Sequence, residues 1–422
     1  MSLTRPLTTP TLTLAMPPPD FWINPTPGPF IPSTFSSSGP SIPSTSLSPI
    51  PPVTSLPHPP TWTTRRLCLK LGSTVIELRE AMGNAIQANV DIEGIEHSGP
   101  AWIGSWTAET VHEDGMAGCK YTADEIFQLT GERNLIYINW GGMLSIPIIN
   151  SYGRIIAILG GTPQDIERWK TITDGAAKLM EDNAYRLSVS EEQLNYCRTH
   201  GPYPSITRGV SHGGGQTEPG NLQTSKKNKQ GDIPSVLFWT FAPLLTTFFQ
   251  VQMGLLAESK PLLVWNFTGS VFAACTFNFG PHAITVPHLD FANLAWGWCA
   301  ITALSRFNPN CGGHLILWDL KLVIWFPLGF TVLIPSALIR HSNVPIAVDK
   351  FWVSFTQYTA GGLFCWIRNG FKTDEQFKLT TSVQEKEAQA EEAKTRWEDS
   401  VSMYSTVDSL LLDRLSASHI AS

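Results

Sequence analysis

The sequence has little of what marks secreted or nucleic-acid-binding proteins. Its seven cysteines contain no CxxC pair and their number is odd. A disulfide framework is therefore not expected, and a reduced, intracellular setting fits better. The formal net charge of −6 gives no broad basic field of the kind that non-specific nucleic-acid binding requires. A nucleic-acid partner must be inferred from other features.

Residues typical of nucleotide-binding loops are also missing. The glycine-rich stretches "LGGTPQD" (159–165) and "HGGGQTEPG" (212–220) have neither the lysine-serine of a phosphate loop nor a GxGxxG between a strand and a helix. Their glycines are expected in turns with positive φ, with a substrate-channel role for 213–222 as the alternative. Residues 1–15 are rich in threonine and proline and do not predict a secretory signal.

Charge is nearly absent from two segments. Residues 1–60 hold 17 of the 32 prolines and only two charged residues, Arg5 and Asp20. We therefore predict a disordered tail over residues 1–61. Val236 to Ala257 carries no charge but includes Pro243. It is interpreted as one buried helix, with a membrane span as the less favoured alternative.

Local patterns predict the first ordered elements. Residues 62–133 are expected to form a mixed helical region, where a capping box from Thr122 to Glu125 opens a helix that Gly131 ends. Apolar runs at 134–139 and 154–161 predict strands.

Thr162 is expected to cap the helix after the second strand. Apolar residues then recur at helical spacing: Ile166, Trp169 and either Leu179 or Met180. Residues 372–422 are predicted to form a C-terminal amphipathic helix, because charges alternate in sign beside an apolar stripe of Trp397, Val401 and Tyr404.

Short runs rich in aromatic and β-branched residues fill the segment 263–360. They are LVWNF (263–267), AACTFNF (273–279), AITV (283–286), CAITAL (299–304), HLILWDL (314–320), KLVIWF (321–326), TVLIPS (331–336) and WVSFTQYT (352–359). Successive short strands without helices between them indicate an antiparallel sandwich or barrel. Together with the helical segments, the fold class is α+β.

A histidine and an aspartate lie two positions apart in "VPHLDFANL", as His288 and Asp290. On a strand both side chains would point the same way. A non-haem Fe(II) site needs a second histidine to complete a facial triad. His341, at the end of "TVLIPSALIRH", is the candidate. The alternative is that all three are hydrogen-bonded polar residues of the core.

The order of motifs around these residues strengthens the metal hypothesis. "TFNFGP", "HLDFANLAWGWCAITAL", "NPNCGGHLILWDLKLVIWFPLGFTVLIPSALIRHSNVPI" and "SFTQYTAGGLFCWIRNGF" follow one another from about 263 to 371. This stretch resembles a fungal family related to the TET and J-binding-protein oxygenases. The resemblance implies a double-stranded β-helix (jelly-roll) domain, here assigned to 134–371, with flanking helices.

The same resemblance implies a function. Fe(II) and 2-oxoglutarate would support hydroxylation of a methyl group on a nucleobase of the 5-methylcytosine or thymine type, with DNA or RNA as partner and a nuclear location. His288, Asp290 and His341 match the metal ligands, Ser354 a position beside the co-substrate carboxylate, and Asn293 a co-substrate or metal-site contact.

One position departs from that pattern. Relatives have an arginine two residues before the serine, where it grips the distal carboxylate of 2-oxoglutarate, and here that position is Trp352. A buried carboxylate without its arginine costs roughly 3–5 kcal/mol. Lys350 is a candidate replacement cation without the fork geometry. A catalytically impaired protein that acts as a binding module is therefore the alternative to an active dioxygenase. The oligomeric state is left open.

Overall fold

The computed structural model describes residues 74–99, 101–105, 122–132, 135–142, 144–163, 165–184, 187, 203–222, 233–267, 270–304, 307–347 and 349–420. The chain divides into two units, Met1–Pro52 and Val53–Ser422, and every described residue belongs to the second unit. The predicted tail at 1–61 lies outside the described residues.

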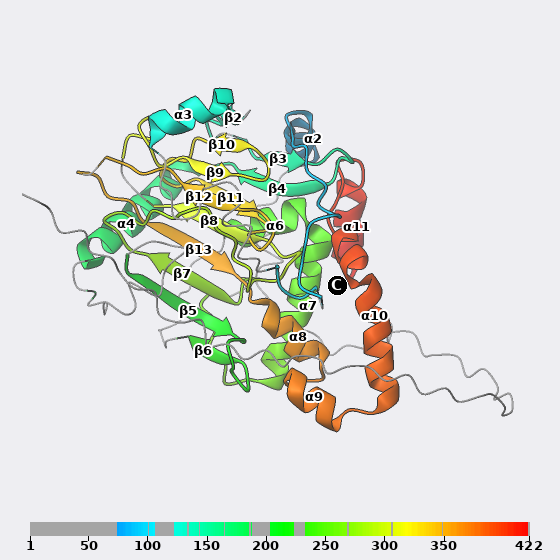
Figure 1. The fold of residues 1–422 in the computed structure, drawn as a ribbon. Helices are drawn as coiled ribbons and strands as arrows, with labels where there is room; N and C mark the ends of the chain where they lie inside the picture. The colour runs from blue at the N-terminus through cyan, green and yellow to red at the C-terminus, as the bar shows by residue number, and fades with distance from the viewer. Residues whose placement is uncertain are drawn as a thin grey trace, which may run out of the picture. The chain divides into compact units, whose positions relative to one another are not determined.

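The described residues form a mixed α+β fold with two sheets (Figure 1). The larger has the order β1-β3-β4-β11-β8-β13-β7-β5-β6. Its strands are β1 (Ile86–Gln87), β3 (Ile146–Ile149), β4 (Ile155–Gly160), β5 (Ser205–Ser211), β6 (Gly220–Leu222), β7 (Ala274–Asn278), β8 (Cys299–Ala303), β11 (Thr331–Ile334) and β13 (Ser354–Tyr358).

The smaller sheet has the order β12-β9-β10-β2. It contains β2 (Ile136–Ile138), β9 (Leu315–Leu317), β10 (Leu322–Ile324) and β12 (His341–Asn343). The helices are α2 (Val75–Gly83), α3 (Ala123–Glu132), α4 (Ile166–Ala184), α6 (Ile233–Phe241), α7 (Pro243–Ser259), α8 (Gly361–Arg368), α9 (Asp374–Thr380), α10 (Val383–Ser402) and α11 (Leu410–Ile420).

Alternation along β9 and β10 divides their side chains between two apolar clusters. Leu315, Leu317, Leu322 and Ile324 belong to the main buried cluster, which also draws on β4, β8 and β11 of the larger sheet. The alternate side chains Ile316 and Val323 belong to a smaller cluster with Ile126 of α3. This period-2 pattern confirms the strand prediction for 314–326.

The same alternation distinguishes the two faces of β13. Val353 and Phe355 pack in a cluster with Ala177 and Met180 of α4. Trp352, which precedes the strand, and Tyr358 instead belong to the main cluster. The even-numbered side chains of this strand therefore point to the interior, and the odd-numbered 353 and 355 point toward α4.

Two predicted strands are wrong. LVWNF and AITV contain no strand, although AITV has buried side chains and those of LVWNF are half-buried. An asparagine takes the place of a partner strand in each: Asn221 Oδ1 accepts from the Val264 N–H (3.0 Å), and Asn343 Oδ1 accepts from the Thr285 N–H (2.8 Å). Because these backbone N–H groups find their hydrogen-bond partners on side chains, the segments need no neighbouring strand.

The helices predicted to begin near Thr122 and after Thr162 are present with shifted boundaries. The capping box of Thr122 and Glu125 is present, and α3 ends one residue past Gly131. The helix α4 begins at Ile166, and Asp165 caps it in place of Thr162, because its Oδ1 accepts from the Arg168 N–H (3.0 Å). A carboxylate three residues before that N–H is ideally placed for this bond.

The predicted single helix over 236–257 is two helices. α6 ends at Phe241 and α7 begins at Pro243. Proline lacks an N–H and fits the first turn of a helix, so it starts α7 and interrupts the run. Within the described residues, no helix is long and apolar enough to cross a membrane.

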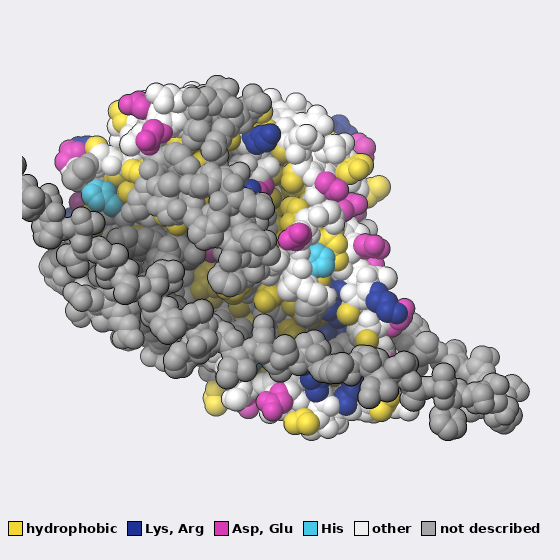
Figure 2. Space-filling view, viewed as in Figure 1, with side chains coloured by type: hydrophobic (Ala, Val, Ile, Leu, Met, Phe, Trp, Pro, Cys, Tyr) yellow, Lys and Arg dark blue, Asp and Glu magenta, His cyan; other side chains and the backbone are white. Residues whose placement is uncertain are grey.

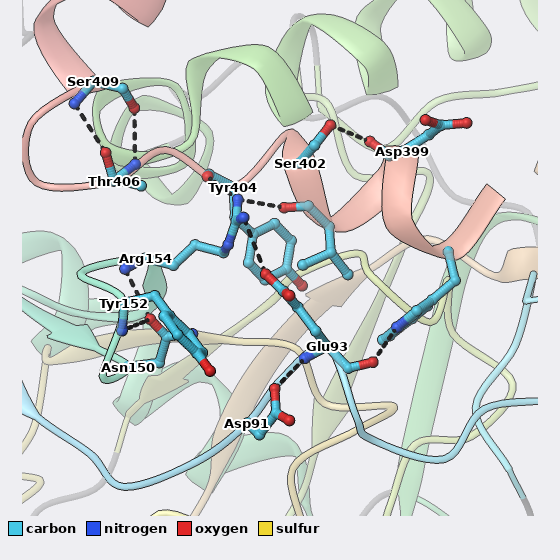
Figure 3. A network of polar contacts seen from close by, with 12 residues as sticks. Asp91, Glu93, Asn150, Tyr152, Arg154, Asp399, Ser402, Tyr404, Thr406 and Ser409 are labelled. Atoms are coloured by element: carbon cyan, nitrogen blue, oxygen red, sulfur yellow. Dashed lines mark hydrogen bonds and ion pairs between the residues drawn. The ribbon is translucent and has the colours of Figure 1, made fainter. Parts of the chain in front are cut away.

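The C-terminal segment folds as α9, α10 and α11 rather than one helix, and the apolar stripe of Trp397, Val401 and Tyr404 belongs to the main buried cluster. Arg154, beside β4, is one of the residues that bind this segment (Figure 3).

The Arg154 guanidinium donates to the carbonyl oxygens of Val401 (3.1 Å) and Tyr404 (3.2 Å) and pairs with Glu93 (3.1 Å). A cation at these carbonyls stabilises the end of α10.

Candidate metal centre

His288, Asp290 and His341 meet in space although they come from different segments. His288 lies outside a regular strand and forms an isolated antiparallel bridge with His341. The His288 N–H donates to the His341 carbonyl (3.1 Å), and the His341 N–H donates to the His288 carbonyl (3.0 Å). This reciprocal pair holds the two histidines directly opposite each other, with ring centroids 4.3 Å apart.

The position of His341 differs from the prediction. Strand β11 ends at Ile334, and His341 begins β12 in the other sheet. Pro335 starts the intervening turn, and its carbonyl accepts from the Leu338 and Ile339 N–H groups. The chain therefore crosses from the larger sheet to the smaller one immediately before the histidine.

The distances among the three side chains suit a divalent ion. One ligand atom from each residue lies within 4.8 Å of the other two. Asp290 Oδ1 is 3.7 Å from His288 Nε2, and Asp290 Oδ2 is 3.9 Å from His341 Nε2. Ligands about 2.1 Å from a metal and at right angles are about 3.0 Å apart. Movements of less than about 1 Å would bring the three atoms to such positions.

Both imidazoles are oriented by the same contact. Nδ1 of His288 bonds the Val286 carbonyl (2.8 Å), and Nδ1 of His341 bonds the Ile339 carbonyl (2.9 Å). A carbonyl can only accept, so each Nδ1 carries the proton and each Nε2 presents a lone pair. This is the arrangement that metal-binding histidines use. The donor set therefore fits Fe(II) or a similar divalent metal.

The two histidines are more deeply buried than the aspartate. The side chains of His288 and His341 are 3% and 6% exposed, whereas that of Asp290 is 21% exposed. The imidazoles are fixed inside the protein, and solvent reaches the site from the side of the carboxylate. A small molecule could approach a bound metal along this side.

Two residues near Asp290 connect it to the turn after β11. The Asp290 N–H donates to the Ser336 carbonyl (2.9 Å), and the Asn293 N–H donates to the Asp290 carbonyl (2.9 Å). Asn293 Nδ2 donates to Ser336 Oγ (3.0 Å). Sequence reasoning named Asn293 but missed Ser336, because a serine five residues before a histidine belongs to no recognised motif.

The Asp290 charge also affects groups on the larger sheet. Burial raises the pKa of the Cys299 thiol, and the nearby Asp290 carboxylate raises it further. The pKa of Tyr358 is raised in the same way, chiefly by burial with a contribution from Asp290. The charge of this carboxylate is therefore felt by residues of both β8 and β13.

Ser354 is the first residue of β13, and Trp352 lies two residues before it. Ser354 Oγ accepts from Asn278 Nδ2 (3.0 Å). Trp352 is 2% exposed, and its ring packs edge-on against Phe307 (5.0 Å between centroids). Gly313 leaves room for this ring, because an added Cβ there would lie 2.7 Å from Cζ3 of Trp352.

Lys350, the candidate replacement cation, points to solvent and pairs with a neighbouring carboxylate. Its side chain is 46% exposed, and Nζ pairs with Asp349 Oδ2 at 2.6 Å. Arg340, next to the metal-site histidine, donates to Asp319 through Nε (2.9 Å) and Nη2 (2.8 Å). On the face shown in Figure 2, lysine and arginine side chains are interspersed with acidic ones rather than gathered in one basic patch.

Comparisons with known proteins give little further guidance. No protein-family model matches the sequence, and no curated protein matches it. Among solved structures, the chain is similar to "NgTET1 in complex with 5mC DNA", with 12% identity and a TM-score of 0.34, over 54% of this chain and 79% of that chain.

Proposed function

We propose that the protein is a 2-oxoglutarate- and Fe(II)-dependent dioxygenase. One observation carries the proposal: two imidazoles with protonated Nδ1 and one carboxylate have ligand atoms within 4.8 Å of one another. Two histidines and one carboxylate that leave positions open are the ligand set of non-haem Fe(II) oxygenases. In this proposal the two sheets are the two halves of a double-stranded β-helix, assigned to 134–371.

The chain's own residues have separate tasks in this proposal. His288, Asp290 and His341 hold the metal, which supplies the activation of dioxygen when it is bound. The two buried imidazoles keep water from one side, and the partly exposed Asp290 borders the open side. Ser354, whose hydroxyl accepts from Asn278 Nδ2, is proposed to contact the co-substrate.

The substrate class comes from the sequence resemblance. The TET and J-binding-protein relatives imply that a methyl group of a nucleobase, in DNA or RNA, is the group hydroxylated, and imply action in the nucleus. Asn293, one turn beyond Asp290, is proposed to contact the co-substrate or to support the metal site, since it hydrogen-bonds Ser336.

Metal binding tests the proposal directly. Anaerobic Fe(II) should bind the wild-type protein with one site, and changing His288, Asp290 or His341 to alanine should abolish binding while the fold is retained. His282→Ala is a matched control, because His282 lies six residues before His288 in the same segment and makes its own bridge to Trp352. Undiminished affinity in any of the three ligand variants contradicts the assignment.

A second candidate function is a binding module that keeps the metal site but turns over poorly. Trp352 favours it, since a buried aromatic ring holds the position where relatives have the arginine that pairs with 2-oxoglutarate. Titration of 2-oxoglutarate into the Fe(II)-loaded protein separates the two. Binding together with succinate release supports the enzyme, and metal binding without co-substrate binding supports the module.

A further inference from the structure

A closed ring of three hydrogen bonds surrounds the backbone of Asp290. The Asp290 N–H donates to the Ser336 carbonyl at 2.9 Å, and the Asn293 N–H donates to the Asp290 carbonyl at 2.9 Å. The side-chain bond from Asn293 Nδ2 to Ser336 Oγ, at 3.0 Å, closes the ring. Both polar groups of the Asp290 backbone are therefore held, and only its two side-chain torsions remain free.

Ser336 is the residue that joins this ring to the rest of the site. It is 1% exposed and lies in the turn between β11 and His341. One serine thus joins the segment of His288 and Asp290 to the segment that leads to His341.

We propose that Ser336 is a positioning residue: together with Asn293, it holds the Asp290 backbone in place, so that the carboxylate stays within reach of the two imidazoles. The proposal rests on the proposed metal site. Its physical basis is preorganisation, because a ligand whose backbone is held before the metal arrives loses less conformational freedom on binding. Residues that orient metal ligands typically change metal affinity by 10–100-fold when they are removed.

The competing interpretation is that Ser336 only stabilises its turn. Ser342 allows the two to be separated, because it is also buried (3% exposed), and its hydroxyl accepts from Trp318 Nε1 at 3.0 Å. It directly follows His341, yet its side chain faces the smaller apolar cluster, to which its partner Trp318 belongs. Ser342→Ala removes a comparable buried hydrogen bond without opening the ring around Asp290.

The experiment measures Fe(II) alone binding anaerobically by calorimetry, and thermal stability in parallel. The variants are Ser336→Ala, Asn293→Ala, the double variant and Ser342→Ala. Each single change in the ring should weaken Fe(II) affinity about tenfold. The double variant should be no weaker than the weaker single variant, because both changes break the same bond. Ser342→Ala should lower stability and leave Fe(II) affinity within about twofold.

The possible results separate the positioning role of Ser336 from the metal site itself. Equal loss of affinity in Ser336→Ala and Ser342→Ala assigns Ser336 a merely structural role and overturns the proposal. Unchanged affinity in both ring variants, while His341→Ala abolishes binding, overturns the positioning role alone and leaves the metal site intact. A wild-type protein that binds no Fe(II) overturns the proposed function and this inference with it. Asn293 is half-buried, so Asn293→Ala still reports on the ring if Ser336→Ala does not fold.

Discussion

Trp352→Arg restores the residue type that relatives use to pair with 2-oxoglutarate, and its effect can be estimated from the structure. Trp352 is 2% exposed, with Phe307 and Phe326 at ring-centroid distances of 5.0 Å and 6.5 Å. A guanidinium in these apolar surroundings without a partner costs about 3–5 kcal/mol. The variant should therefore be less stable than the wild type when no co-substrate is present.

Added 2-oxoglutarate should offset part of this loss, because its distal carboxylate would become the partner of the new guanidinium. We expect affinity to rise at least tenfold, about 1.4 kcal/mol. At a concentration one hundred times the variant's Kd, binding stabilises the fold by about 2.7 kcal/mol. The wild type, at ten times its own Kd, would gain only about 1.4 kcal/mol.

Thermal unfolding can detect this difference. The unit Val53–Ser422 spans 370 residues. At about 2.1 cal/mol/K per residue, its unfolding entropy is about 0.78 kcal/mol/K. The expected rise in Tm with 2-oxoglutarate is then about 3.5 °C for Trp352→Arg and about 1.8 °C for the wild type.

Trp352→Leu is the control, because it removes the aromatic ring without adding a charge. It should lose stability, and its response to 2-oxoglutarate should not exceed that of the wild type. The reasoning is refuted if Trp352→Arg responds no more strongly than Trp352→Leu. Lys350→Ala should leave binding unchanged if the ion pair with Asp349 persists, and a clear loss would identify Lys350 as the cation that meets the carboxylate.

Two further predictions concern stability. Arg154→Met should lower the free energy of unfolding in urea by about 2 kcal/mol, since charge-assisted bonds to the Val401 and Tyr404 carbonyls are lost; full rescue by Arg154→Lys would contradict this, because lysine lacks the fork. Burial lowers the pKa of His314 to about 4. Its folded form resists protonation, so stability is lost as pH falls from about 6.5 to about 4, by up to about 3 kcal/mol. His314→Phe should lose correspondingly less between urea titrations at pH 7 and pH 4, and an unchanged pH dependence would exclude His314 as the cause.

Much of the fold follows from local sequence patterns, and the errors have a common cause. The hairpin of β9 and β10 and the capping box at Thr122 depend on neighbours in sequence, and both are present. The failures depend on distant partners. Nothing in LVWNF reveals that Asn221 will bond its backbone in place of a strand, with its Nδ2 donating to the Val264 carbonyl at 2.7 Å.

The candidate metal centre was predictable in its residue types but not in the register that assembles it. The pairing of β12 with β9 places His341 opposite Leu317 and Ser342 opposite Ile316. Leu317 packs in the main cluster and Ile316 in the smaller one. Since side chains alternate across a sheet, a slip of one residue would turn His341 outward and bring Ser342 inward. Because Leu317 points inward, His341 opposite it also points inward and reaches Asp290. The two reciprocal backbone hydrogen bonds with His288 stabilise this register.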